Sequence, residues 1–259
     1  MLDTIQYLLG AGSGVLVGFV LGLVGGGGSI LAVPLMVYLV GIPSPHVAIG
    51  TSALAVAINA LTGLIAHIRR GNVKWRCSLV FAAAGIAGAF GGSTAGKAID
   101  GDKLLFLFAL VMIGVGAMML RSRGRTGDPA VVLGRDNAPK LVGYGLGTGL
   151  FSGFFGIGGG FLVVPGLVAA TGMPMLYAVG SSLVAVTAFG LTTAANYAFS
   201  GLVDWALAAV FILGGLGGGF LGARVATRLG ENQARLTTIF AVLIFAVAGY
   251  TLWKSAAAF

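Results

Sequence analysis

Charged side chains are scarce in this sequence. Only 8% of its 259 residues are Asp, Glu, Lys or Arg, whereas 58% are hydrophobic. A soluble domain of this length has no means of hiding so much apolar surface, because its own exterior must carry polar groups. The composition therefore excludes a soluble protein and a protein with one anchor, and it predicts an all-α polytopic membrane protein.

Cysteine and histidine are also rare, with one cysteine and two histidines in the chain. A single cysteine, Cys77, excludes an intramolecular disulfide and a thiolate metal cluster. No group of His, Cys and acidic residues is spaced as a catalytic or metal centre would require, so we expect no enzyme, no metal and no cofactor. Neither glycine motif described below holds a cysteine, which disfavours covalent relay of sulfur.

Ionisable residues are missing from the middle of every predicted membrane span, and all seven acidic residues lie in loops or at segment ends. This pattern disfavours a proton relay through a buried carboxylate. A cationic substrate would lack a counter-charge. An anion can be held by backbone N–H groups and hydroxyls without a charged side chain, so the pattern favours an anionic substrate.

The net charge of +8 comes from basic residues in short loops between apolar segments. This is the distribution of orientation signals, so we expect no nucleic-acid partner. The first nine residues contain no basic residue. They therefore predict a retained first helix and not a cleaved signal peptide.

Ten apolar segments can be traced along the chain. In the first half they span 5–24, 29–41, 45–68, 76–97 and 103–120, and in the second half 139–156, 161–171, 175–199, 205–226 and 234–256. Four segments of each half are long enough to cross about 30 Å of hydrocarbon, and the second of each is a half-helix. The predicted organisation is a first repeat (1–120), a cytoplasmic linker (121–138) and a second repeat (139–259).

The two halves repeat one another. Gly14, Gly18, Gly22 and Gly25 recur 131 residues later as Gly145, Gly149, Gly153 and Gly156. After one deletion the offset is 130, and Gly50-Thr51-Ser52 corresponds to Gly180-Ser181-Ser182. Glycines four residues apart in these segments predict helix faces that pack closely.

Corresponding loops carry opposite charge character. The loop 69–76 has four basic residues, whereas its counterpart 200–205 has only Asp204. Basic loops stay cytoplasmic, so the two halves are predicted to insert in opposite orientations, with both termini external. The protein is expected in a prokaryotic plasma (inner) membrane.

Each repeat contains a glycine run before its short segment. The glycines allow the backbone to break and approach a ligand, and the exposed N–H groups of the following helix favour an anion. The predicted substrate-binding residues of the first run are Gly25, Gly26, Gly27, Gly28 and Ser29, and those of the second are Gly156, Gly158, Gly159 and Gly160. The alternative for either run is close helix packing.

Four hydroxyls and two amides complete the predicted site. Thr51, Ser52, Ser181 and Ser182 open the third segment of each half and are candidate donors to an oxyanion, or else caps of that helix. Asn59 and Asn196 lie within apolar segments and are further candidates. The alternative for both amides is hydrogen bonding between helices.

These motifs resemble the sulfite exporter TauE/SafE family. The resemblance rests on the glycine runs, on the prolines that follow them (Pro34 and Pro165) and on the Gly-(Thr/Ser)-Ser sequences, and it covers nearly the whole chain. It implies a secondary transporter with inverted repeats and small sulfur-containing anions as substrates. The family's signature positions fall on Gly25, Gly27, Gly28, Pro34, Gly156, Gly158, Gly159 and Pro165.

The sequence thus predicts a transporter that exports sulfite or an organosulfonate by alternating access, with the anion bound at midplane between the glycine runs. A passive anion channel or uniporter is the alternative, because a missing coupling carboxylate suits it equally. The predicted partners are the small anion and the lipid bilayer. A proton or sodium coupling ion and a homo-oligomer are both compatible with the sequence.

Overall fold

A computed structural model describes residues 2–24, 26–121, 132–158, 160–228 and 233–256, and every regular element in these ranges is a helix. The first half contains α1 (Thr4–Val24), the 3₁₀-helix η1 (Gly26–Leu31), α2 (Ala32–Pro34), the π-helix η2 (Leu35–Leu39), α3 (Pro45–Arg69), α4 (Trp75–Lys97) and α5 (Gly101–Arg121). The second half contains α6 (Ala138–Phe155), α7 (Gly160–Thr171), α8 (Met175–Ala198), α9 (Trp205–Arg228) and α10 (Gln233–Ala256).

Within the described residues, five helices are long and apolar enough to cross a membrane, namely α1, α3, α4, α8 and α9. Their candidate spans are Thr4–Leu23, Pro45–Arg69, Trp75–Lys97, Met175–Ala198 and Trp205–Val225. The sequence led us to expect four such helices in each half. The all-helical membrane fold is confirmed, while the further crossings by α5, α6 and α10 stay predictions.

The short segment of the first half differs from the single half-helix that we expected. Between Gly26 and Leu39 it is a 3₁₀-helix of six residues, then an α-helical stretch of three and a π-helical stretch of five. Pro34 has no N–H to donate to the preceding turn, so the hydrogen-bond register is free to change there. In the second half the short segment is one helix, α7, of 12 residues, with Pro165 inside it.

Turns at corresponding places have the same backbone conformation. Gly71 follows α3 and Gly201 follows α8, each with a φ of 69°. Gly41 (φ 79°) and Gly172 (φ 73°) follow the two short segments. A left-handed residue after a helix is strained unless it is glycine, which explains glycine at these four helix ends.

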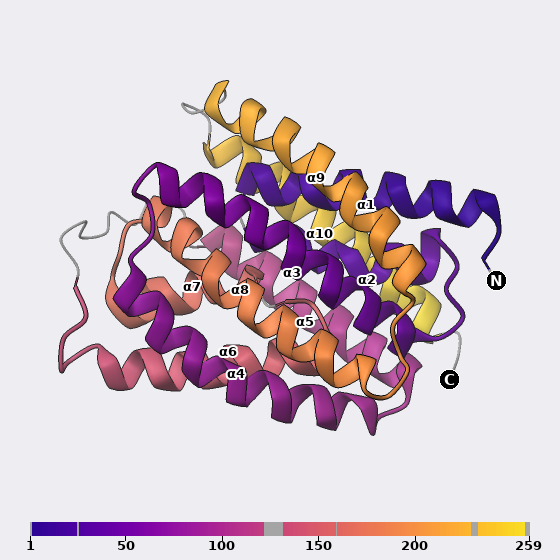
Figure 1. Cartoon of the computed structure of the whole chain (residues 1–259), viewed down its shortest axis with the longest axis horizontal. Coiled ribbons are helices and arrows are strands. Elements are labelled where there is room, and N and C mark those ends of the chain that lie inside the picture. The colour runs from indigo at the N-terminus through magenta and orange to yellow at the C-terminus, as the bar shows by residue number, and fades with distance from the viewer. Residues whose placement is uncertain (1, 25, 122–131, 159, 229–232, 257–259) are drawn as a thin grey trace.

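Two helix pairs form the outer layers of the molecule, α1 with α9 and α4 with α6 (Figure 1). In the first pair a Cβ on Gly18 would collide with the carbonyl oxygen of Gly215. In the second, a Cβ on Gly149 would collide with the carbonyl oxygen of Gly85, which is the corresponding contact. The regularly spaced glycines therefore let the backbones approach closely, as predicted.

The third helix of each half, α3 and α8, lies between these layers (Figure 1). They pack against each other in opposite directions, because Gly190 of α8 approaches Ala57 while Leu183, earlier in α8, approaches Gly63, later in α3. The short segments also meet, since η1 contacts α7. Antiparallel packing of equivalent helices is the arrangement expected of inverted repeats; their orientation in a membrane stays a prediction.

Candidate functional site

The second glycine run forms a sharp break between α6 and α7. Gly156 (φ 67°) and Gly158 (φ 63°) are both left-handed, and the N–H of Ile157 donates to the carbonyl of Ser152 at 3.2 Å. A Cβ on Gly158 would lie 2.9 Å from Cγ1 of Val56 and 3.5 Å from Cγ1 of Val186. Glycine is thus required here by conformation and by space.

This break lies at the centre of the molecule. Val56 belongs to α3 and Val186 to α8, and they are equivalent residues of the two halves. Gly158 is therefore placed where the central helices meet. Gly159, which was predicted to bind substrate, lies outside the described residues.

The first glycine run has another conformation. Gly26, Gly27 and Gly28 belong to the 3₁₀-helix η1 and are not an extended break before a helix. A Cβ on Gly28 would lie 2.8 Å from the carbonyl oxygen of Val17, so η1 packs on the backbone of α1. Gly25 lies outside the described residues.

Each glycine run lies at the start of a helical segment, η1 or α7. The first N–H groups of a helix have no carbonyl partner within it, which applies to the start of α7 at Gly160 and to the start of η1. These groups and the helix dipole favour an anion. Gly158, Gly160 and Ser29 are buried in the described structure.

The hydroxyl pairs do not open their helices, because α3 begins at Pro45 and α8 at Met175. The expectation that they cap these helices is therefore wrong. Instead, Oγ1 of Thr51 accepts a hydrogen bond of 3.0 Å from the N–H of Asp204, just before α9. Oγ of Ser181 accepts one of 2.9 Å from the N–H of Lys74, just before α4.

A glycine reinforces each of these two bonds. A Cβ on Gly50 would collide with the carbonyl of Leu202, and a Cβ on Gly180 would collide with that of Asn72. We call the first group the Thr51 contact (Gly50, Thr51, Leu202 and Asp204) and the second the Ser181 contact (Gly180, Ser181, Asn72 and Lys74). Each contact joins the two halves, at opposite ends of the central helix pair.

The neighbouring hydroxyls bond within their own helices. Ser52 donates to the carbonyl of Ile49 at 3.0 Å, and Ser182 donates to that of Val179 at 2.8 Å. Both side chains are fully buried. In this conformation their hydroxyl hydrogens are therefore engaged, and neither is directed to a ligand.

Asn196 links α8 to α4. Its Nδ2 donates to Oγ of Ser93 at 2.6 Å and to Oγ1 of Thr94 at 2.9 Å. Its Oδ1 accepts from Nζ of Lys97 at 2.8 Å. These bonds correspond to the alternative of interhelical hydrogen bonding. The contribution of Lys97 was not foreseen, because a residue at a helix end carries no signal of its partner.

Asn59 is different, because both polar atoms of its side chain are buried without a hydrogen-bond partner. The amide lies against Gly215 of α9. At the equivalent position of the other half, Phe189 lies against Gly85. A buried amide without hydrogen bonds lowers the stability of the folded protein. Asn59 therefore remains a candidate for contact with a ligand or water.

Ser152 is a further candidate that the sequence did not bring to our attention. Its hydroxyl is fully buried and has no partner, and its carbonyl accepts the bond from Ile157 that shapes the second break. Its position four residues before Gly156 was the available signal. Ser152 has no counterpart in the first repeat, where Leu21 stands, so the search for repeated residues passed over it.

The comparison with known families decides the class of this protein. The model of the family described as sulfite exporter TauE/SafE matches residues 10–251. The chain belongs to this family. Together with the five apolar helices, membership of the TauE/SafE family makes the chain an integral membrane protein of a transporter family.

Curated relatives of this TauE/SafE member are named as probable membrane transporters. A "Probable membrane transporter protein" of Xylella fastidiosa (strain Temecula1 / ATCC 700964) is 52% identical over 256 residues, which cover 97% of each chain. The "Probable membrane transporter protein YdhB" of Bacillus subtilis (strain 168) is 27% identical over 243 residues, covering 92% of this chain and 96% of the relative. No solved structure matches the chain.

Proposed function

We propose that this protein exports small sulfur-containing anions, such as sulfite or organosulfonates, across the prokaryotic plasma membrane. The observation that carries the proposal is the meeting of the two broken segments, η1 and α7, beside the central helices of a TauE/SafE family member. Broken helices at the interface of two repeats are where many transporters bind their substrates. Translocation of the anion requires no covalent step.

The anion binds to the first amides of α7 and η1 in this proposal. Gly158 and Gly160 let the backbone come close to the ligand, and the dipole of α7 adds positive potential. Asn59 and Ser152 are two of the described buried side chains with polar atoms that have no hydrogen-bond partner. Gly25 and Gly159 complete the two runs by sequence.

Access to the site alternates between the two ends of α3 and α8. The Thr51 contact closes one end and the Ser181 contact closes the other, so opening one at a time exposes the centre to one side only. We assign the Ser181 contact to the cytoplasmic side, because Lys74 belongs to the basic loop 69–76 and basic loops stay cytoplasmic. Both termini are then external.

A flux assay tests this proposal. The purified protein is reconstituted into vesicles loaded with radiolabelled sulfite, and efflux is followed with and without sulfite outside. Alternating access predicts efflux that saturates with internal concentration and is accelerated by external substrate. Efflux that rises linearly and ignores external sulfite would instead establish a passive channel.

A further inference from the structure

Lys97, the last residue of α4, is bound to the end of α8 in the other half of the chain (Figure 1). Its Nζ donates hydrogen bonds to the carbonyl oxygen of Asn196 at 3.0 Å, to Oδ1 of Asn196 at 2.8 Å and to Oγ of Ser200 at 2.9 Å. A lysine ammonium has three N–H donors, so these three acceptors match its full set. We call this group the Lys97 clamp (Lys97, Asn196 and Ser200).

The clamp closes the last turn of α8. The final carbonyls of a helix have no N–H partner within it, and the negative end of the helix dipole favours a cation. The N–H groups of residues 199–202 donate to three carbonyls of this turn. The carbonyl of Asn196 accepts instead from Lys97 and from Oγ of Ser200. Nζ of Lys97 also lies 5.8 Å from the centre of the buried Tyr197 ring, within the range of a cation–π interaction.

The chain that the clamp holds goes on to form the Thr51 contact. Leu202 and Asp204 follow within four residues of Ser200. The carbonyl of Leu202 lies against Gly50, and the N–H of Asp204 donates to Oγ1 of Thr51. To move this loop away from α3, the protein must either bend the chain directly after Ser200 or break the clamp.

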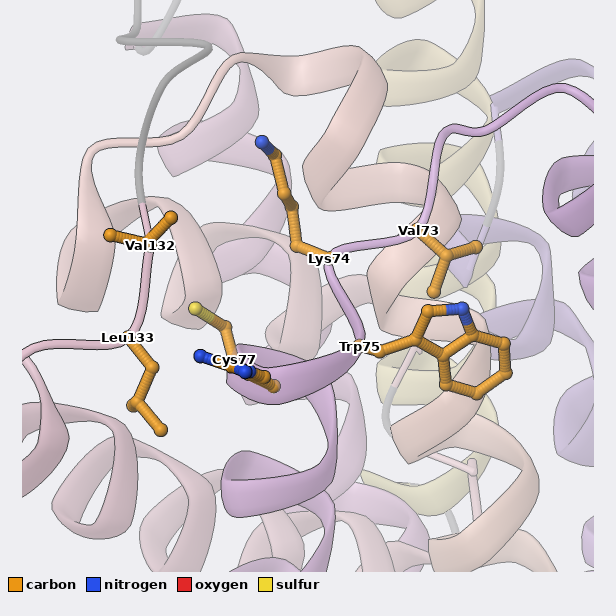
Figure 2. Close-up of a pocket in the computed structure, with 7 residues that line it drawn as sticks. Val73, Lys74, Trp75, Cys77, Val132 and Leu133 are labelled. Carbon is orange, nitrogen blue, oxygen red and sulfur yellow. The ribbon is translucent and has the colours of Figure 1, made fainter.

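The end with the Ser181 contact lacks the residues of such a clamp. There the chain enters α4 through Val73, Lys74 and Trp75 (Figure 2). At the positions equivalent to Asn196, Ser200 and Lys97, at an offset of 130, the chain has Ala66, Arg70 and Thr227. An alanine has no side-chain acceptor and a threonine has no charge, so the sequence cannot repeat the clamp at this end.

We infer that Lys97 is a positioning residue for the Thr51 contact, and that its clamp makes this end of the central helix pair harder to open than the end with the Ser181 contact. The consequence for transport rests on the proposed function, which places the Thr51 contact outside. The protein without substrate then opens in preference to the cytoplasm, which is the side from which an exporter takes up its substrate.

Two equivalent residues report on the two ends. Val203 lies in the loop of the Thr51 contact and Val73 in the loop of the Ser181 contact, and both side chains are half-buried. Val203→Cys and Val73→Cys are made separately in a Cys77→Ser background, which removes the single native cysteine. The rate of alkylation by N-ethylmaleimide, a neutral reagent, is then measured in the detergent-purified protein, with and without Lys97.

Lys97→Met removes the charge and the three donors, so we expect alkylation at residue 203 to accelerate several-fold and alkylation at residue 73 not to accelerate. Lys103→Met removes the same charge from the exposed start of α5, next along the chain, and is expected to change neither rate. An unchanged rate at residue 203 in Lys97→Met, or an equal acceleration at both residues, would overturn the inference. If Lys97→Met gives no folded protein, Ser200→Ala, which removes one acceptor, decides in the same way with a smaller acceleration at residue 203.

Efflux measurements separate this inference from the transport proposal. A protein that is less often open to the cytoplasm has a lower apparent affinity for internal substrate. Lys97→Met is therefore expected to raise the half-saturating internal concentration of sulfite several-fold, and Lys103→Met to leave it unchanged. The expected alkylation pattern without saturable efflux in the wild type would overturn transport and leave the clamp standing. Saturable efflux, with equal alkylation at residue 203 whether or not Lys97 is present, would overturn the clamp and leave transport standing.

Discussion

Replacing Gly158 with alanine tests whether the second break requires a glycine. The new Cβ would occupy a left-handed conformation, which costs about 1–2 kcal/mol for a residue with a side chain. It would also lie 2.9 Å from Cγ1 of Val56, and overpacking of a tight interior costs about 1–3 kcal/mol. Together we expect a loss of about 2–5 kcal/mol or a displaced break.

Two control variants separate the terms of this cost. Gly201→Ala has the same conformational penalty (φ 69°) but no atom within 4 Å of the new Cβ, so we expect a loss of about 1–2 kcal/mol. Gly147→Ala has neither penalty, and we expect it to stabilise α6 by about 0.5–1 kcal/mol.

The assay combines denaturant unfolding in detergent with sulfite efflux from vesicles. Gly158→Ala is expected to abolish efflux even when folded protein is recovered, because the amides that follow it would move. Adding Val56→Ala removes the crowding and is expected to recover part of the lost stability. Wild-type efflux by folded Gly158→Ala protein would refute the assignment of the break as the binding site.

Four further substitutions address the remaining features. Thr51→Val and Ser181→Ala each remove the acceptor of one hydrogen bond between the halves and leave a partly buried N–H unpaired. Each should lower the free energy of unfolding by about 1–3 kcal/mol and raise the rate of efflux from vesicles. Gly92→Val should lower the yield of folded protein on size-exclusion chromatography without a specific change in substrate affinity, because its side chain would collide with the carbonyl of Leu150. Asn59→Leu should keep or raise thermal stability and lower efflux; unchanged efflux would mean that the amide does not contact the substrate.

The helices could be predicted closely from the sequence. The segment expected at 76–97 is α4 at Trp75–Lys97, and that expected at 161–171 is α7 at Gly160–Thr171. Both helices are bounded by glycine, proline or charged residues, which end a helix through local effects on the backbone that the sequence reveals. The mixed helical types between Gly26 and Leu39 were missed, because they depend on how Pro34 and the neighbouring α1 constrain the backbone together.

The repeat located the candidate site but could not disclose the bonds between its halves. The correspondence of Thr51 with Ser181 marked them as a pair with a shared role. Their partners, Asp204 and Lys74, lie far away in the sequence and in the opposite half, so no local pattern indicates them. The same holds for Asn196, whose partner Lys97 is visible only in the packed structure.

The most direct test of anion binding at the second glycine break is thermal unfolding of the detergent-purified protein with different anions. The panel contains sulfite, thiosulfate, sulfate, sulfoacetate, acetate and chloride at equal ionic strength, with Gly158→Ala as the parallel sample. A ligand at a hundred times its Kd stabilises the folded state by about 2.7 kcal/mol. We predict a selective upward shift with a sulfur anion in the wild type and none in Gly158→Ala; equal shifts for all anions, or the same selective shift in both proteins, would contradict binding at the glycine break.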